Sequence, residues 1–137
     1  MKLPNLFGKK NAGEELEKKA PYRIKTELFP YKLYANKRSN SSLSISLKND
    51  TNEPMLTSVV IELPNGLSFD EIGLEKTKEV RIGEMAPNEE KSISVNIRSD
   101  VGTDAGDYTI TITAFAHYRD YGHVLNGIRK RMMIEVI

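Results

Sequence analysis

Residues 108–118 alternate between two kinds of side chain, and this alternation constrains the fold more than any other feature of the sequence. The even-numbered positions include Ile110 and Ile112, whereas threonine occupies positions 109, 111 and 113. Successive side chains of a β-strand point to opposite faces of a sheet, so a period of two indicates a strand with one buried face. The β-branched residues also disfavour a helix. We therefore expect a long strand whose even-numbered side chains, from Tyr108 to Tyr118, face the core.

The same period of two recurs in shorter segments along most of the chain. Asparagine, aspartate, proline and glycine gather between these segments, for example at 49–54, 64–66 and 120–122, and predict turns there. The expected strands cover residues 22–28, 31–35, 43–47, 59–63, 80–82, 93–97, 108–118 and 132–136. Seven or more short strands with turns between them are typical of an all-β fold, the antiparallel β-sandwich.

Residues 1–20 differ in character from the rest of the chain. Leu3, Leu6 and Phe7 form a short apolar cluster, and a charged stretch follows at 14–19. This stretch is compatible with a short helix, which Pro21 ends. With 137 residues, the whole chain has the length of one domain. We therefore predict an N-terminal extension over residues 1–20 and one sandwich domain over residues 21–137.

Composition excludes several kinds of site. The chain has no cysteine, so it has no disulfide, no thiolate metal ligand and no cysteine nucleophile. No apolar run reaches the length of a membrane-spanning helix, and the first residues lack the pattern of a secretory signal. We therefore expect a cytoplasmic protein that needs no cofactor.

Charge is unevenly distributed, although the net charge is only +1. Residues 1–48 hold 11 Lys and Arg against 4 Glu, a net of +7, and residues 49–137 hold 9 against 15 acidic residues, a net of −6. This asymmetry fits a basic arm for an acidic partner or membrane surface, and it also fits two halves that attract each other. We favour the second interpretation because surfaces rich in lysine and glutamate also serve solubility.

Three segments resemble a known group of domains. They are LKNDTNEPM at 47–55, VIELPNGL at 60–67 and IGEMAPNE at 82–89. In this order they resemble the immunoglobulin-like (Ig-like) domains of archaeal S-layer-related proteins and the CARDB-type modules of bacterial and archaeal cell surfaces. The resemblance covers about residues 31–137 and implies an Ig-like β-sandwich of about seven strands.

A fourth segment resembles the D-x-G-x-Y-x-C run of immunoglobulin domains. It comprises Asp104, Gly106 and Tyr108, with Ile110 at the position of the disulfide cysteine. The resemblance implies that Tyr108 forms a tyrosine corner, in which the hydroxyl bonds to backbone upstream while the ring packs in the core. Asp104 and Gly106 would then stabilise the corner.

Two candidate chemical sites lack the residues that their chemistry needs. His117 and His123 flank a loop, but no serine or cysteine nucleophile signature lies near them, so we expect them to line the loop. Asp100, Asp104 and Asp107 share a second loop, yet their spacing lacks the dense alternation of a calcium-binding loop. We therefore predict neither an enzyme nor a metal site.

Arg129, Lys130 and Arg131 are the densest basic run in the second half of the chain. Nucleic-acid binding usually combines such a run with a reading helix, a finger or interleaved aromatic residues, and the sequence offers none of these. We expect the three cations to be solvated and predict no nucleic-acid partner.

The candidate binding surface is an apolar stripe on the outer face of one sheet. If the strands around Val60 and Phe115 and the last strand are neighbours, then Val60, Phe115, Met133 and Ile137 lie together where water is expected. Such a stripe usually meets a partner. Two occupants are equally consistent with it: the chain itself, through its N-terminal segment or a homodimer, or an external protein.

Two classes of function remain after these exclusions. The first is a non-catalytic module for protein-protein association, with itself or with a partner. The alternative is a module that binds carbohydrate or another ligand, which requires an aromatic platform; Tyr31, Tyr118 and Tyr121 are the candidates for it.

Overall fold

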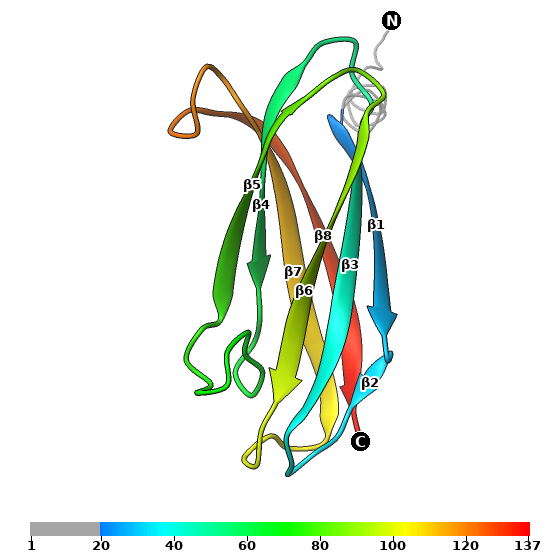
Figure 1. Ribbon diagram of the computed structural model, residues 1–137, viewed down its shortest axis with the longest axis vertical. Helices are drawn as coiled ribbons and strands as arrows, with labels where there is room; N and C mark the ends of the chain where they lie inside the picture. The colour runs from blue at the N-terminus through cyan, green and yellow to red at the C-terminus, as the bar shows by residue number, and fades with distance from the viewer. Residues whose placement is uncertain (1–19) are drawn as a thin grey trace, which may run out of the picture.

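The computed structural model describes residues 20–137, which form eight β-strands and no helix (Figure 1). The apolar cluster and the helix expected in the N-terminal extension lie outside the described residues. The strands are β1 (Tyr22–Phe29), β2 (Lys32–Leu33), β3 (Ser39–Asn49), β4 (Met55–Glu62), β5 (Thr77–Met85), β6 (Glu90–Ser99), β7 (Gly106–His117) and β8 (Val124–Val136). The predicted all-β fold class is confirmed.

The strands form two sheets that face each other. One sheet has the order β1-β3-β6, and the other has the order β2-β8-β7-β4-β5. Neighbouring strands are antiparallel, except that β2 runs parallel to β8. β1 begins at the upper end of the sandwich, and β8 ends at the lower end (Figure 1).

The core lies between the sheets and is built from the alternating apolar side chains. Ile45 and Ile97 enter it from the smaller sheet, and Ile61, Ile110 and Ile112 enter it from the larger one; all five are fully buried. Each such side chain contributes about 1.5–3 kcal/mol by leaving water. The alternation therefore both specifies the strands and supplies most of the stability.

At the upper end of the sandwich, Tyr22 lies inside the core and Tyr118 lies outside it. Tyr22 is 2% exposed, its hydroxyl lies 2.6 Å from Thr57 Oγ1, and burial raises the pKa of this hydroxyl. Tyr118 was expected on the core face, but it follows the end of β7 and is 49% exposed. Arg119 has a φ of 69°, so the chain turns away from the strand at this point.

Asn49 joins two turns at the upper end of the molecule. Its buried side-chain amide donates to the carbonyl oxygens of Glu53, Met85 and Ala86, over 2.9 to 3.2 Å. Its Oδ1 accepts from the backbone N–H of Thr51 at 2.9 Å. The turn after β3 is therefore fixed to the turn between β5 and β6.

Candidate functional site

The register of the larger sheet decides whether the residues of the predicted apolar stripe touch. β4, β7 and β8 are neighbours, as the stripe requires. Phe115 pairs with Gly127 on β8, whereas Met133 pairs with Thr109. From Thr109 to Phe115 a strand rises about 20 Å. The structure therefore separates the stripe into an upper pair, Val60 and Phe115, and a lower pair, Met133 and Ile137.

The upper pair already packs within the domain. Phe115 and Val60 are only half exposed. A Cβ added to Gly127 would lie 3.2 Å from Phe115 Cδ1, so the ring lies against the bare backbone of this glycine. An aromatic ring placed over a cross-strand glycine is a known way to cover such a gap. Phe115 is therefore a local packing residue and offers little area to a partner.

Tyr121 covers the upper end of the same face. Its hydroxyl accepts a hydrogen bond from the backbone N–H of Gly83 on β5, at 3.1 Å. The guanidinium carbon of Arg81 lies 4.6 Å from the centre of its ring, a cation-π contact. The ring of His117 meets its edge with 5.1 Å between the centres. The loop between β7 and β8 is thus fixed to β5.

His117 is buried beneath Tyr121, where the sequence analysis expected a residue lining an open loop. It is 6% exposed, and its Nε2 lies 2.7 Å from Ser58 Oγ. This distance suits a nucleophile and its base, but Ser58 is 1% exposed, and His117 Nδ1 has no hydrogen-bonding partner among the described residues. The pair joins β4 to β7, with the Ser58 hydroxyl buried, while His117 also lines a surface hollow together with Tyr118 and Arg119 of the loop.

His123 lies outside this cluster and forms a separate pair in the loop. Its Nδ1 is 2.8 Å from Asp120 Oδ1, and both side chains are exposed. His123, and then the backbone N–H of Gly122, lower the pKa of Asp120. The two histidines singled out in the sequence therefore do not face a common site.

The lower pair forms a patch with a residue that the sequence analysis did not select. The backbone N–H of Ile137 donates to Leu33 O at 3.0 Å, which extends the parallel ladder of β2 and β8 by one residue. Because Leu33 faces the core, Tyr34 faces outward beside Ile137. Met133, Ile137 and Tyr34 are 58%, 46% and 41% exposed. The exposed Glu135 lies between Met133 and Ile137 on the same outer face, so one carboxylate interrupts the apolar row. We call these three residues the corner patch.

The three tyrosines proposed as a ligand platform do not lie together. Tyr31 follows β1 at the lower end of the molecule. Tyr118 and Tyr121 belong to the loop between β7 and β8 at the upper end (Figure 1). Tyr121 is also fixed against β5, as described above. The structure therefore offers no single aromatic platform built from these residues.

Tyr108 forms a corner at the start of β7. Its hydroxyl donates to the carbonyl oxygen of Asp104 at 2.7 Å. Its ring lies across Gly66, where an added Cβ would be 2.8 Å from Tyr108 Cε2. Gly66 has a φ of 102° and Gly106 a φ of 151°, which favour glycine at both positions. The corner thus ties the turn after β4 to the start of β7.

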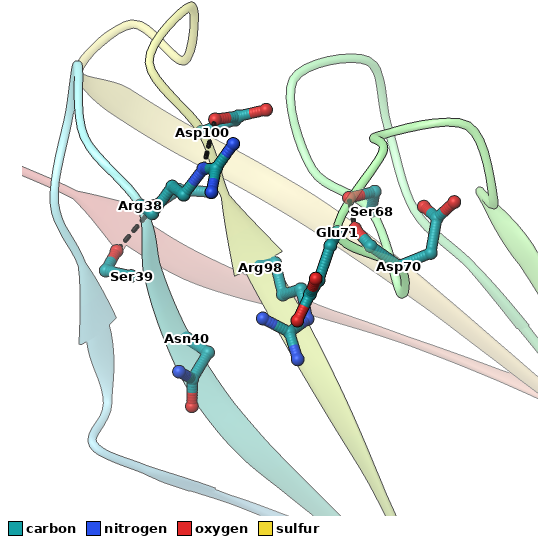
Figure 2. Close-up of a pocket in the computed structure, with 9 residues that line it drawn as sticks. Arg38, Ser39, Asn40, Ser68, Asp70, Glu71, Arg98 and Asp100 are labelled. Carbon is teal, nitrogen blue, oxygen red and sulfur yellow. Dashed lines mark hydrogen bonds and ion pairs between the residues drawn. The ribbon is translucent and has the colours of Figure 1, made fainter.

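A polar pocket of about 150 Å³ lies at the lower end, between the ends of β3 and β6 and the loop that follows β4 (Figure 2). Arg38 and Asp100 form an ion pair across 3.5 Å. Arg98 also lines the pocket, and its buried Nε has no hydrogen-bonding partner among residues 20–137. Asp70 and Glu71 reach the pocket from the loop.

One charged group of this pocket, the Asp70 carboxylate, holds the loop together. Asp70 Oδ1 accepts from the backbone N–H groups of Glu75, Leu74 and Gly73, at 3.0 to 3.2 Å. These bonds, that of Glu75 first, lower the pKa of Asp70. Backbone bonds in both directions between Ser68 and Arg98 attach the loop to β6. This contact could not be predicted from the sequence, because nothing in the pattern of residues 64–76 indicates which strand they meet.

Among residues 20–137, no three acidic or histidine side chains gather closely enough to hold a metal ion. Asp100 instead binds Arg38, and its Oδ1 also accepts from the backbone N–H of Val101. No helix in this part of the chain is long and apolar enough to cross a membrane.

Comparisons with known proteins bear on the fold. No protein-family model and no curated protein sequence matches the chain. A crystal structure of native alpha-2-macroglobulin from Escherichia coli, spanning domain MG7 to the C-terminus, matches with a TM-score of 0.63 at 20% identity, over 86% of this chain and 17% of that one. Salmonella alpha-2-macroglobulin gives 0.60 at 20% identity, over 85% and 7%. A FixG-related protein from Vibrio parahaemolyticus gives 0.53 at 10% identity, over 85% and 96%.

These similarities support one conclusion about the chain. It spans less than a fifth of the macroglobulin chains that it matches, and identities this low carry the fold without the function. None of the three proteins is described as a CARDB-type or S-layer module, so that part of the resemblance stays a prediction. Together with the sheet order, the matches show that residues 20–137 adopt an Ig-like β-sandwich.

Proposed function

We propose that the domain is a non-catalytic module that binds another polypeptide through the corner patch. The observation that carries this proposal is the exposure of Met133, Ile137 and Tyr34 on one face, at an edge of the sheet that β2 covers over only two residues. Tyrosine and methionine are enriched at protein interfaces, where their large side chains bury area with few rotatable bonds or adapt to the partner.

The structure does not favour the carbohydrate alternative. That function needs aromatic rings that share one face, and Tyr31 lies at the other end of the sandwich from Tyr118 and Tyr121.

Membership of the CARDB-type or S-layer-related modules remains a proposal that rests on the segments at 47–55, 60–67 and 82–89. The cytoplasmic location is likewise a proposal, which cell fractionation tests.

A photo-crosslinking residue at position 133 tests the proposed surface in the full chain. We expect light-dependent adducts with a second polypeptide, either another copy of this chain or a different protein. The matched control places the same residue at position 72, because Ile72 is 77% exposed in the loop between β4 and β5 and lies outside the patch. Adducts that form equally from both positions, or from neither, contradict the proposal.

Substitution of the patch separates self-association from binding to a partner. If the adduct is a dimer of this chain, light scattering shows twice the chain mass, and Ile137→Asp returns it to the monomer. If the adduct contains another protein, light scattering shows a monomer, and Ile137→Asp removes the adduct formed from position 133. Ile72→Asp leaves both results unchanged, because it introduces the same charge elsewhere on the surface.

A further inference from the structure

Within residues 20–137, no strand pairs with part of the β8 edge that faces away from β7. The backbone N–H and C=O of Ile137 both bond toward β2. Backbone groups in a strand alternate in direction, so those of Arg129, Arg131 and Met133 point the same way. β2 pairs only with Glu135 and Val136. No described residue bonds to the backbone of these three residues on this side.

The free stretch has a defined end on each side. Asn126 Oδ1 accepts from the backbone N–H of Gly127 at 2.8 Å, which satisfies the next donor along the same edge. At the other end β2 begins its pairing at Glu135. The open edge therefore spans Arg129 to Met133, which is the length over which a short extended segment can pair.

Within the stretch from Arg129 to Met133 itself, every charged side chain is cationic, whereas Glu27 of β1 and Glu135 lie at its margins. Arg129 and Arg131 are exposed on the outer face, and within residues 20–137 no carboxylate forms an ion pair with them or with Lys130. The edge strand β5 differs, because its Arg81 pairs with its own Glu79 at 3.8 Å. The free edge of β8 is thus cationic, whereas the edge of β5 is locally neutral.

The inner side of the same edge is apolar. Ile128 and Met132 of β8 pack against the core but stay half exposed, and so do Ile24 and Leu28 of β1. β1 belongs to the other sheet and faces β8 across the open side of the sandwich, where Lys130 Nζ lies 3.4 Å from Ile24 O. A strand added to β8 would bury these half-exposed side chains beneath its own inner face.

We propose that the edge of β8 from Arg129 to Met133 binds an extended, acidic segment of a partner protein as an added β-strand. Its acidic side chains lie beside Arg129 and Arg131, and the alternate apolar side chains cover Ile128 and Met132. The added strand supplies the missing backbone bonds, as in other cases of strand addition. This inference rests on the proposed binding function and names the chemistry of the partner next to the corner patch.

A second copy of the chain fits this edge less well. Two β8 strands paired antiparallel about a central axis would bring Arg129 and Arg131 of one copy opposite those of the other. Like charges directly opposite each other are destabilising in a sheet. Cationic edge residues therefore oppose self-pairing and favour a segment of opposite charge.

The probe for this inference is a nine-residue peptide of alternating glutamate and valine, blocked at both ends, added to the full chain at low salt. We expect its binding to shift the amide NMR signals of Arg129, Arg131 and Met133 and to slow their hydrogen exchange at least tenfold. Three control peptides separate the contributions. The first replaces glutamate by lysine. The second carries N-methyl groups on the valines, and the third carries them on the glutamates. Only one of these two methylated peptides loses the backbone N–H groups that face β8.

The charge-reversed double variant Arg129→Glu, Arg131→Glu gives the matched comparison. Both side chains are exposed, so we expect an unchanged Tm. The variant should lose at least tenfold in affinity for the glutamate peptide and gain affinity for the lysine peptide.

If both N-methylated peptides bind equally well, the peptide does not pair with β8 as an added strand. If the shifted signals lie elsewhere, or if no peptide binds, the edge of β8 is not the binding site. These outcomes leave the crosslinking at position 133 unaffected, so they are distinct from failure of the proposed function.

Discussion

The side of the sandwich formed by β5 and β6 is closed by several contacts, whereas the side formed by β1 and β8 is left open. On the first side, Lys91 Nζ of β6 donates to Glu84 O of β5 at 3.3 Å, and the backbone of Ser68 pairs with that of Arg98 on β6. The Tyr121 hydroxyl also accepts a hydrogen bond from the backbone N–H of Gly83 on β5. On the second side, Lys130 reaches Ile24 O at 3.4 Å. Within residues 20–137, side-chain and loop contacts therefore join the two sheets more tightly on the first side than on the second.

The two sides also use irregular backbone differently. Gly83 has a φ of 91°, and the pairing of β4 with β5 shifts register between Thr57 and Ser58. A bulge of this kind bends a strand and interrupts the regular edge that another chain could join. From Asn126 to Val136, in contrast, β8 keeps a regular register with β7. Regular backbone with unpaired groups is what an added strand requires.

The largest effect that we predict is on the closed side. Asn49→Ala removes the amide that binds Glu53, Met85 and Ala86, and leaves buried carbonyl oxygens without donors. We expect a loss of about 2–4 kcal/mol in the free energy of unfolding. Urea denaturation measures it. The control Asn126→Ala, which removes a cap on the open side, should cost no more than about 0.5 kcal/mol. Equal losses would show that the two sides do not differ in this way.

A smaller effect should follow from Tyr121→Phe. The ring stays against Arg81 and His117, but the hydroxyl that accepts the N–H of Gly83 is lost. We expect a loss of about 1 kcal/mol and faster hydrogen exchange at Gly83, both measurable by NMR. Tyr118→Phe is the control, because no hydrogen bond involves its exposed hydroxyl within the described chain. Exchange at Gly83 that stays unchanged would contradict the role of Tyr121.

The smallest effect concerns Asp70, whose loop attaches to β6. The pKa of Asp70 is lowered in the folded state, so its contribution to stability is present above the unfolded value of 3.8 and is lost as pH falls through the lower folded value. We expect Asp70→Asn to lower the Tm at pH 7 and to have almost no effect near the folded pKa and below it. Thermal unfolding across this range checks it. The control is Asp104→Asn, which should leave the Tm at pH 7 unchanged because the Asp104 side chain makes no hydrogen bond in the described residues.

The sequence predicted the fold class and the inward face of almost every strand, because both follow from a period of two. It did not predict which rows of side chains are adjacent, because pairing register depends on turns and bulges as well as on alternation. For that reason Phe115 of β7 and Met133 of β8 were expected together, although the register places them about six residues apart along the strand direction. Tyr34 was missed because its neighbour Ile137 is brought to it by the short parallel pairing of β2 and β8.

The burial of His117 also lay beyond sequence reasoning. Alternation placed it on the outer face, which is its position, but the loop residue Tyr121 folds back over it. This contact depends on the conformation of the loop between β7 and β8, which the two-residue alternation of a strand does not predict. The pocket around Arg98 has the same origin, because its lid is the loop after β4.

β1 begins at the upper end of the molecule and β8 ends at the lower end (Figure 1). If the domain is held by these two strands between larger bodies, tension runs along the strands rather than across them. The bonds of β1 to β3 and of β8 to β7 lie perpendicular to that pull. Under such a pull these bonds would be loaded together instead of one at a time.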